Sequence, residues 1–233
     1  MIAMLAATFT GRGRGEPALT SFTTIDVPGA TATQAFGINE SGQIVGTYVA
    51  GPIGHSFLLS EGIFTTIEVP GATGTTATGI NDSGQIVGFY EDPTGITHGF
   101  LLSQVIFTTI DAPHLSPFTI AGGINDRGQM VGTYFPGPRL SFLLSQGIFT
   151  TIQVPGAPST NARGINDSGQ IVGDYGDPTP FGTTHGFLLS QGIFTTIEVP
   201  GATATNATGI NDRGQIVGFY IDTSGAFHGF LLD

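Results

Sequence analysis

Cysteine, tryptophan and lysine are absent from this sequence. Without cysteine the chain has no disulfide framework and no thiol chemistry. Only 10% of the residues are charged, and the formal net charge is -11 at pH 7. A surface of this sign repels nucleic acid phosphates and anionic lipid, so we expect neither nucleic acid nor a membrane as a partner. No apolar run approaches the roughly 18 residues of a membrane-spanning helix.

The first 20 residues stand apart from the rest of the chain. Residues 2–7 are apolar but form a short run, without the basic segment or clear cleavage site of a signal peptide. A polar stretch rich in glycine and arginine, residues 11–15, follows them. We therefore expect residues 1–20 to be a tail outside the fold, a remnant of an export signal being one reading, and residues 21–233 to form one domain.

A stretch of the form Gly-Ile-Asn-Asp-Ser-Gly-Gln-Ile-Val-Gly occurs five times with small changes. Its copies begin at Gly37, Gly79, Gly123, Gly164 and Gly209, so the spacings are 42, 44, 41 and 45 residues. A unit that recurs at such a period across nearly the whole chain indicates a repeat protein.

Each repeat is interpreted as four short strands. The first ends in Gly-Ile-Asn, and a turn of the type Asp-Ser-Gly leads to the second, Gln-Ile-Val-Gly-x-Tyr. The third is His-Gly-Phe-Leu-Leu, and the fourth is Phe-Thr-Thr-Ile followed by Pro-Gly in most copies. A four-stranded unit of about 43 residues is typical of a propeller blade. The sequence therefore predicts an all-β fold, a five-bladed β-propeller with four antiparallel strands per blade. The competing solenoid usually needs polar end caps, which are not visible here.

The two ends of the domain complement each other. The first repeated element is a lone fourth strand, residues 21–28, and the chain ends at residue 233 with a third strand that lacks its fourth. We expect residues 21–28 to become the outer strand of the last blade, which would close the ring and remove an exposed sheet edge.

A family resemblance rests on the run of residues 77–88 followed by His98-Gly99-Phe100-Leu101 and a fourth strand. This pattern, which spans residues 21–233, resembles the bacterial HAF repeats, which carry His-Ala-Phe where this chain has His-Gly-Phe. The resemblance implies an extracellular or periplasmic bacterial protein with a propeller fold, and it implies no established activity. As a shape, a five-bladed propeller also resembles tachylectin-like sugar-binding lectins and several glycoside hydrolase families, by analogy of fold only.

Length variation between the repeats falls on one face of the predicted propeller. From Gly of the first strand to Tyr of the second the distance is 11 residues in every repeat, whereas from that Tyr to Phe of the third it is 9, 10, 8, 12 and 10. The second-to-third turns share a face with the links between blades. Because binding usually resides in variable loops on a constant scaffold, we expect the ligand site on this face, around the central channel.

Residues that break the repeat pattern are the candidates for that site. Arg163 and Asp174 are the only charged residues at their repeat positions and both belong to the fourth repeat, so we expect a cross-strand ion pair or contacts to a polar ligand. Asp174 and Asp177 form the irregular acidic cluster that could supply the two carboxyl groups, roughly 5–10 Å apart, of a glycoside hydrolase. The candidate ligand-binding residues are Phe36, His114, Arg139, Arg163, Asp174 and Tyr175.

Three recurrent residue types have structural interpretations. Four His residues, one per repeat, are spread around the predicted ring and are expected to make hydrogen bonds within their blades rather than converge on a metal. Tyr occupies one position in all five repeats, either packed with its hydroxyl satisfied or lining repeated sugar pockets. The Asn-Asp-Ser-Gly segments lack the further carboxylates of a calcium loop and are expected to be turns. No metal and no cofactor are expected.

The nearly identical repeats make several equivalent binding sites natural. The favoured hypothesis is therefore a secreted, monomeric, lectin-like module that binds carbohydrate or another small polar ligand. An alternative is a polysaccharide-acting hydrolase or lyase with a single site at the channel mouth, where Asp174 and Asp177 would act as catalytic residues. A structural or interaction scaffold is the third alternative.

Overall fold

The computed structural model describes residues 23–51, 53–113, 118–135, 139–178 and 182–233, and within these ranges every regular element is a β-strand. The predicted all-β class is therefore confirmed. The first sheet contains β1 (Ala32–Ile38), β2 (Ile44–Ala50), β3 (Ile53–Ser60) and β4 (Ile63–Ile67). The second contains β5 (Gly74–Ile80), β6 (Ile86–Glu91), β7 (Thr97–Ser103) and β8 (Ile106–Ile110). The third contains β9 (Thr119–Ile124), β10 (Met130–Tyr134), β11 (Leu140–Ser145) and β12 (Ile148–Ile152).

The remaining strands form two further units. The fourth contains β13 (Ser159–Ile165), β14 (Ile171–Gly176), β15 (Thr184–Ser190) and β16 (Ile193–Ile197). The last contains β17 (Ala204–Ile210), β18 (Ile216–Ile221) and β19 (Phe227–Leu232). Each unit is called a blade here, and strands adjacent in sequence pair antiparallel within it. A single parallel bridge, Thr184 to Ala204, joins the fourth blade to the fifth.

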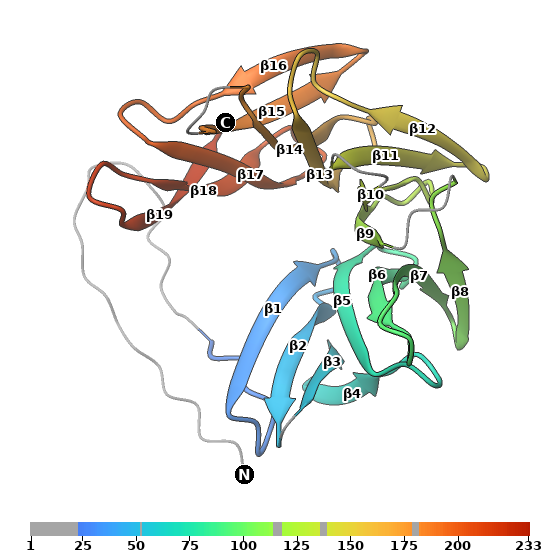
Figure 1. The fold of residues 1–233 in the computed structure, drawn as a ribbon. Coiled ribbons are helices and arrows are strands. Elements are labelled where there is room, and N and C mark those ends of the chain that lie inside the picture. Colours follow the sequence, from blue (N-terminus) through green and yellow to red (C-terminus); the bar gives the residue numbers. More distant parts are fainter. Residues whose placement is uncertain (1–22, 52, 114–117, 136–138, 179–181) are drawn as a thin grey trace.

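The blades stand side by side in an arc, with their first strands toward the middle and their fourth strands outside (Figure 1). The arc is open between β1 and the sheet of β17–β19. The expected closing strand, residues 21–28, is not formed: residues 23–28 lie outside the strands, and residues 21 and 22 lie outside the described residues. A strand exists only beside a partner edge, and the open side of the arc separates β19 from β1 (Figure 1).

A β-bulge interrupts the first strand of every blade. The register with the second strand shifts at one extra residue, which is Phe36, Thr78, Gly122, Arg163 or Thr208. The glycine of Gln-Ile-Val-Gly faces this irregularity: a Cβ on Gly88 would lie 2.0 Å from the carbonyl oxygen of Thr76. Only glycine therefore fits there, and the bulge turns the side chain of the extra residue out of the regular alternation.

The hydrophobic core lies in layers between consecutive blades. In one layer Val45 and Ile67 of the first blade pack with Ile80, Ile86 and Phe100 of the second. The Phe of the third strand is fully buried in the first four blades, at Phe57, Phe100, Phe142 and Phe187. Each buried aromatic ring of this kind contributes about 1.5–3 kcal/mol, so the contacts between blades carry much of the stability.

The turns between first and second strands form a polar ladder that joins one blade to the next. Asn81 closes its own turn, because its Oδ1 accepts a hydrogen bond from the Gln85 amide at 2.9 Å. Its Nδ2 also donates across the junction to the Asn125 carbonyl at 3.0 Å, and the Asp82 amide donates to Asp126 Oδ1 at 2.7 Å. The same pair of contacts recurs at all four junctions. The predicted turns are therefore confirmed, and they also fix the spacing of the blades.

Candidate functional site

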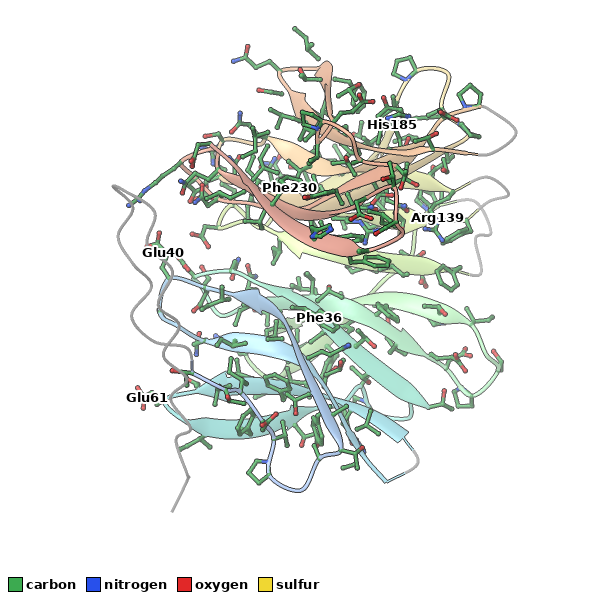
Figure 2. All side chains as sticks on the ribbon, turned by 90° about the vertical axis from the view of Figure 1, so that its left-hand side faces the viewer. Phe36, Glu40, Glu61, Arg139, His185 and Phe230 are labelled. Atoms are coloured by element: carbon green, nitrogen blue, oxygen red, sulfur yellow. The ribbon has the colours of Figure 1, made fainter. Side chains whose placement is uncertain are left out.

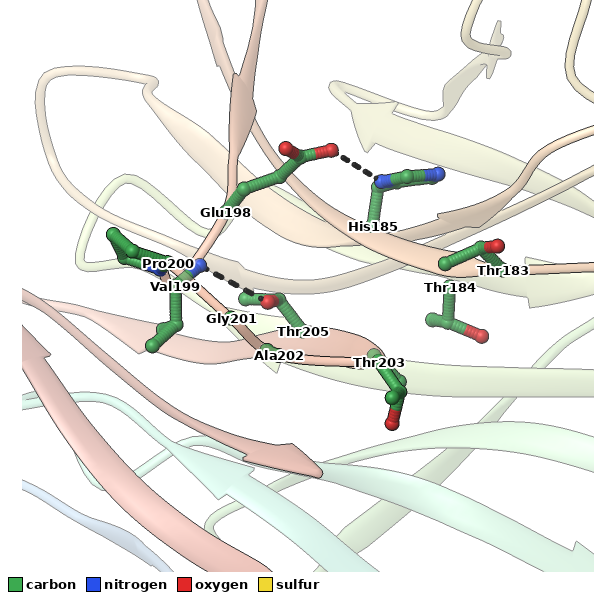
Figure 3. Close-up of a pocket in the computed structure, with 11 residues that line it drawn as sticks. Thr183, Thr184, His185, Glu198, Val199, Pro200, Gly201, Ala202, Thr203 and Thr205 are labelled. Atoms are coloured by element: carbon green, nitrogen blue, oxygen red, sulfur yellow. Dashed lines mark hydrogen bonds and ion pairs between the residues drawn. The ribbon is translucent and has the colours of Figure 1, made fainter. Parts of the chain in front are cut away.

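A cleft of about 390 Å³ opens between the fourth and fifth blades (Figure 3). One wall is Thr183 with the start of β15, Thr184 and His185. The other wall is Glu198 and the link into β17, residues 199–205, which includes Thr203 and Thr205. Hydroxyls, an imidazole and a carboxylate thus line the cleft, with the small apolar surfaces of the Pro-Gly-Ala segment between them. Such a lining suits a ligand rich in hydroxyl groups.

A second cleft of about 370 Å³ lies between the first and second blades. Tyr48 and Val49 of β2 form one side, and Thr73, Thr75 and Phe89 of the second blade contribute to the other. Both clefts include the link between blades, so they lie on the face where the repeats vary in length. The variable repeat lengths predicted that face, with the site around the central channel, whereas the clefts lie between neighbouring blades.

A histidine and a carboxylate are paired at the wall of the first cleft. His185 Nδ1 lies 2.6 Å from Glu198 Oε1, and the imidazole packs on the Tyr175 ring at a centroid distance of 5.2 Å. The Tyr175 hydroxyl lies 2.9 Å from Oγ1 of Thr196 on the neighbouring outer strand. Equivalent pairs are His55 with Glu68 and His98 with Asp111. The expected structural role of these histidines, a hydrogen bond within the blade, is confirmed.

The third blade shows that the two partners belong together. It has Leu140 where the other blades have His, and Gln153 where the others have a carboxylate. Gln153 instead donates to the Ala157 carbonyl at 3.3 Å. Replacement of both members in the same blade is what a paired function predicts, because a carboxylate left alone would lose its partner.

Acids in the second-to-third turns approach the same histidines from the other side. His98 Nε2 lies 3.5 Å from Asp92, and His185 Nε2 lies 3.4 Å from Asp177. Burial alone would lower the pKa of His98, but hydrogen bonds and charges from Asp111 and Asp92 outweigh it and raise the pKa above 6.5. Hydrogen bonds from the Thr94 hydroxyl and the Ile96 amide lower the pKa of Asp92 to about 2. Each of these two imidazole rings thus lies between two carboxylates.

A separate polar network breaks the repeat symmetry in the fourth blade. The carboxylate of Asp174, only 5% exposed, accepts hydrogen bonds from Arg163 Nε and from Asn161 Nδ2. Asn161 Oδ1 accepts a hydrogen bond at 3.2 Å from Arg139, whose guanidinium also lies 4.6 Å from the ring centroid of Phe135. Arg163 is the bulge residue of β13 and its side chain stays 42% exposed.

The structure therefore brings three of the sequence candidates, Arg139, Arg163 and Asp174, into one chain of contacts. Asn161, which connects them, was not among the candidates. Asn161 can be recognised as a site residue only when the strand register is known, because it stands directly opposite Asp174 across the β13–β14 pair. Charged and amide side chains at opposed positions of one hairpin then indicate a network.

The remaining candidates lie elsewhere. Phe36 is the bulge residue of β1 at the open end of the arc and is 51% exposed. Tyr175 packs on His185, a residue that lines the first cleft, and Asp177 contacts the same histidine. His114 lies outside the described residues. Asp174 and Asp177 thus belong to different side-chain networks, and both oxygens of Asp174 already accept hydrogen bonds from protein groups.

Among the residues that the structure describes, no set of three or more His, Asp or Glu side chains is placed to hold a metal ion. No helix in the described part of the chain has the length and apolar character to cross a membrane.

No family model matches the sequence, and no curated protein matches it either. Solved structures resemble the fold. The fucose-specific lectin from Aleuria aurantia aligns with a TM-score of 0.53 at 13% identity, over 93% of this chain and 78% of the lectin. Catalytically inactive virginiamycin B lyase from Staphylococcus aureus with quinupristin gives 0.52 at 14%, over 85% and 70% of the two chains. TolB from Acinetobacter baumannii gives 0.57 at 12%, over 86% and 54%. At such identities the likeness concerns the fold alone, and the fold is that of β-propeller proteins.

Proposed function

We propose that this protein is a carbohydrate-binding β-propeller module whose ligand sites are the clefts between blades. The observation that carries the proposal is that clefts with several threonine side chains in their lining lie at two separate junctions, each on the face of the blade links. Threonine hydroxyls can donate and accept hydrogen bonds, and carboxylates accept them, which matches the alternating hydroxyls of a sugar. The likeness in fold to a fucose-specific lectin supports the proposal.

The proposal extends to the whole protein as a secreted bacterial five-bladed propeller with a closed ring. The resemblance to HAF repeats supports an extracellular or periplasmic location, and the near identity of the repeats supports several equivalent sites. A hydrolase or lyase built on Asp174 and Asp177 has less support, because the two acids are engaged in different contacts. Several sugar equivalents bound per chain would distinguish the module from a scaffold without a small ligand.

Calorimetric titration with a panel of free monosaccharides and soluble polysaccharides tests the proposal. We expect binding of a sugar with more than one equivalent per chain. The double variant Thr183→Val and Thr184→Val removes two hydroxyls from the first cleft and should lower the stoichiometry or the affinity. Thr195→Val, on the outer strand β16 and outside the residues that line the cleft, is the matched control.

Two results would contradict carbohydrate binding at the clefts. One is the absence of heat with every sugar of the panel at millimolar concentration. The other is sugar binding whose stoichiometry and affinity are the same in the Thr183/Thr184 double variant as in the Thr195→Val control. Release of new reducing ends from a polysaccharide in the same tubes would instead identify an enzyme, and Asp174→Ala would then be the next variant.

A further inference from the structure

The two ends of the arc expose the side chains that every other blade buries. The Val of Gln-Ile-Val-Gly is fully buried in four blades, yet Val217 of the last blade is 48% exposed. The Ile of Gly-Ile-Asn is 8% exposed at Ile80 and 66% exposed at Ile38 of the first blade. Figure 2 looks onto this open side, with Phe230 on the last blade above and Phe36 on the first blade below. The exposed faces are thus the two halves of one ordinary blade junction.

The close packing between blades is also incomplete at one position. A methyl group on Gly37 would lie 3.2 Å from the Cα of Gly79, and Gly79, Gly123 and Gly164 each have the next glycine at a similar distance. Gly209 has no such neighbour among the described residues. Likewise, Asn211 Nδ2 donates to Gln215 Oε1 within its own turn, and the contact that its counterparts make to the following blade is absent from the described part. Asn39 and Glu40 stand at the positions that would receive it.

The segment before β1 already has the conformation of a link between blades. The Val27 amide donates to Thr33 Oγ1 at 3.1 Å, and the Ala30 amide donates to the Val27 carbonyl at 3.0 Å. The link into the fifth blade has the same two contacts, from Val199 to Thr205 at 3.2 Å and from Ala202 to Val199 at 3.0 Å. In that link the chain arrives from the fourth strand β16. Residues 23–26 therefore precede a link that in the other blades follows a fourth strand. Within the described ranges, the third strand β19 of the last blade has no fourth strand beside it.

In the described part of the chain, the histidine of the last blade has one carboxylate contact where its counterpart His98 has two. His228 Nε2 lies 2.9 Å from Asp222 Oδ2, as His98 lies near Asp92. At His98 the Nδ1 atom also meets Asp111 on the fourth strand, whereas no carboxylate contact to His228 Nδ1 is present among the described residues. Asp26 is the residue at the corresponding position of the repeat, four residues after Phe22 as Asp111 is after Phe107.

We infer that the open side of the arc closes: residues 23–28 then pair with β19 of the same chain, Asp26 bonds His228 Nδ1, and the first and last blades enclose a further cleft. Residues 28–33 read Pro-Gly-Ala-Thr-Ala-Thr, identical to residues 200–205 that line the first cleft. The wall opposite would be His228 with Phe227 in place of Thr184, so this cleft is more apolar. Its use as a sugar site rests on the function proposed above; the pairing itself does not.

The geometry favours the same chain over a second copy as the occupant of the open side. Residues 23–28 continue directly into β1, so one docking event forms both the strand pair with β19 and the blade contact with β17. Such an intramolecular event has an effective concentration in the millimolar range. A head-to-tail contact between copies would use the same surfaces but would form an extended array or a larger ring.

A designed disulfide tests the pairing, because the chain has no cysteine of its own. Leu188 stands opposite Thr195 in the β15–β16 pair, and the same register places Leu231 opposite Thr23. Thr23→Cys with Leu231→Cys should form an intramolecular disulfide under mild oxidation in dilute full-length protein. Thr195→Cys with Leu188→Cys is the control for a pair already in place. Disulfide-linked dimers, or free thiols where the control is oxidised, would overturn the inference.

The imidazole resonances of the histidines in NMR spectra give a second, non-covalent measurement. Asp26→Asn should shift the ring resonances of His228, since it removes the carboxylate that faces Nδ1 in the closed arrangement while Asp222 remains at Nε2. Asp111→Asn should shift the ring resonances of His98 in the same way. His228 resonances that Asp26→Asn leaves unchanged, while the control shifts, would refute the contact. Failure of the sugar titrations would leave both measurements unaffected, so the two proposals fail separately.

Discussion

Substitution of Gly88 by alanine should weaken the second blade severely. The new Cβ would lie 2.0 Å from the Thr76 carbonyl oxygen and 2.8 Å from Cε1 of Phe100. The first obstacle is backbone held in a strand pair and the second is a fully buried ring, so neither can move away freely. Overpacking of a close-packed interior costs about 1–3 kcal/mol. Because the strands themselves must separate here, we expect a loss of about 3 kcal/mol or more in the free energy of unfolding.

Urea unfolding followed by far-ultraviolet circular dichroism measures this loss, and Gly54→Ala is the control. Gly54 lies in β3, and a methyl group there meets nothing within 4 Å. Alanine in a strand loses less conformational entropy on folding than glycine, so Gly54→Ala should be neutral or stabilising by about 0.5–1 kcal/mol. If the free energy of unfolding of Gly88→Ala lay within about 0.5 kcal/mol of the parent value, the bulge would not explain the repeated glycine.

Three further perturbations probe the polar contacts. Arg163→Met should lower the free energy of unfolding by about 2 kcal/mol, because buried Asp174 loses its cation; a urea midpoint equal to that of the parent would contradict this. The pKa of His98 is raised in the folded state, so its contribution to stability is fully present below pH 6.5 and is lost as the pH rises through the folded value. Asp111→Asn should therefore flatten the decline in stability between neutral and alkaline pH, and parallel pH profiles would refute the contact. Asn81→Ala removes side-chain hydrogen bonds to its own turn and to the next blade, and should cost about 2 kcal/mol in urea unfolding; a loss below about 0.5 kcal/mol would count against the ladder.

The strands could be predicted from the sequence because the same local residue preferences recur in all five repeats. The alternation of β-branched and aromatic residues with Asn, Asp and Gly turns places β6 and β7 to about one residue, whereas β5 begins earlier and β8 ends earlier than the repeated motifs indicate. The bulge could not be predicted from the sequence. An extra residue is defined only by how two strands pair, and pairings with and without the bulge satisfy the residue preferences equally. The open arc also differs from the predicted ring, since closure depends on contacts between distant parts of the chain.

The candidate site was predictable in part. Arg163 and Asp174 stand out as charges at positions that are otherwise uncharged, and the structure pairs them. Asn161 could not be recognised without the bulge, since the bulge decides which residue of β13 faces Asp174. The clefts could not be predicted either, because their volume depends on how far two neighbouring blades diverge at the links, which no local pattern encodes.

The ladder between the turns gives the array a direction. At each junction the earlier blade donates, through an Asn side chain and a backbone amide, and the later blade accepts. A duplicated repeat inserted beside its parent would accept hydrogen bonds from the preceding turn and donate them to the following turn, without any change of side chain. A repeat array of this type can thus grow or shrink by whole units during evolution, while the curvature at each junction limits how many units a ring holds.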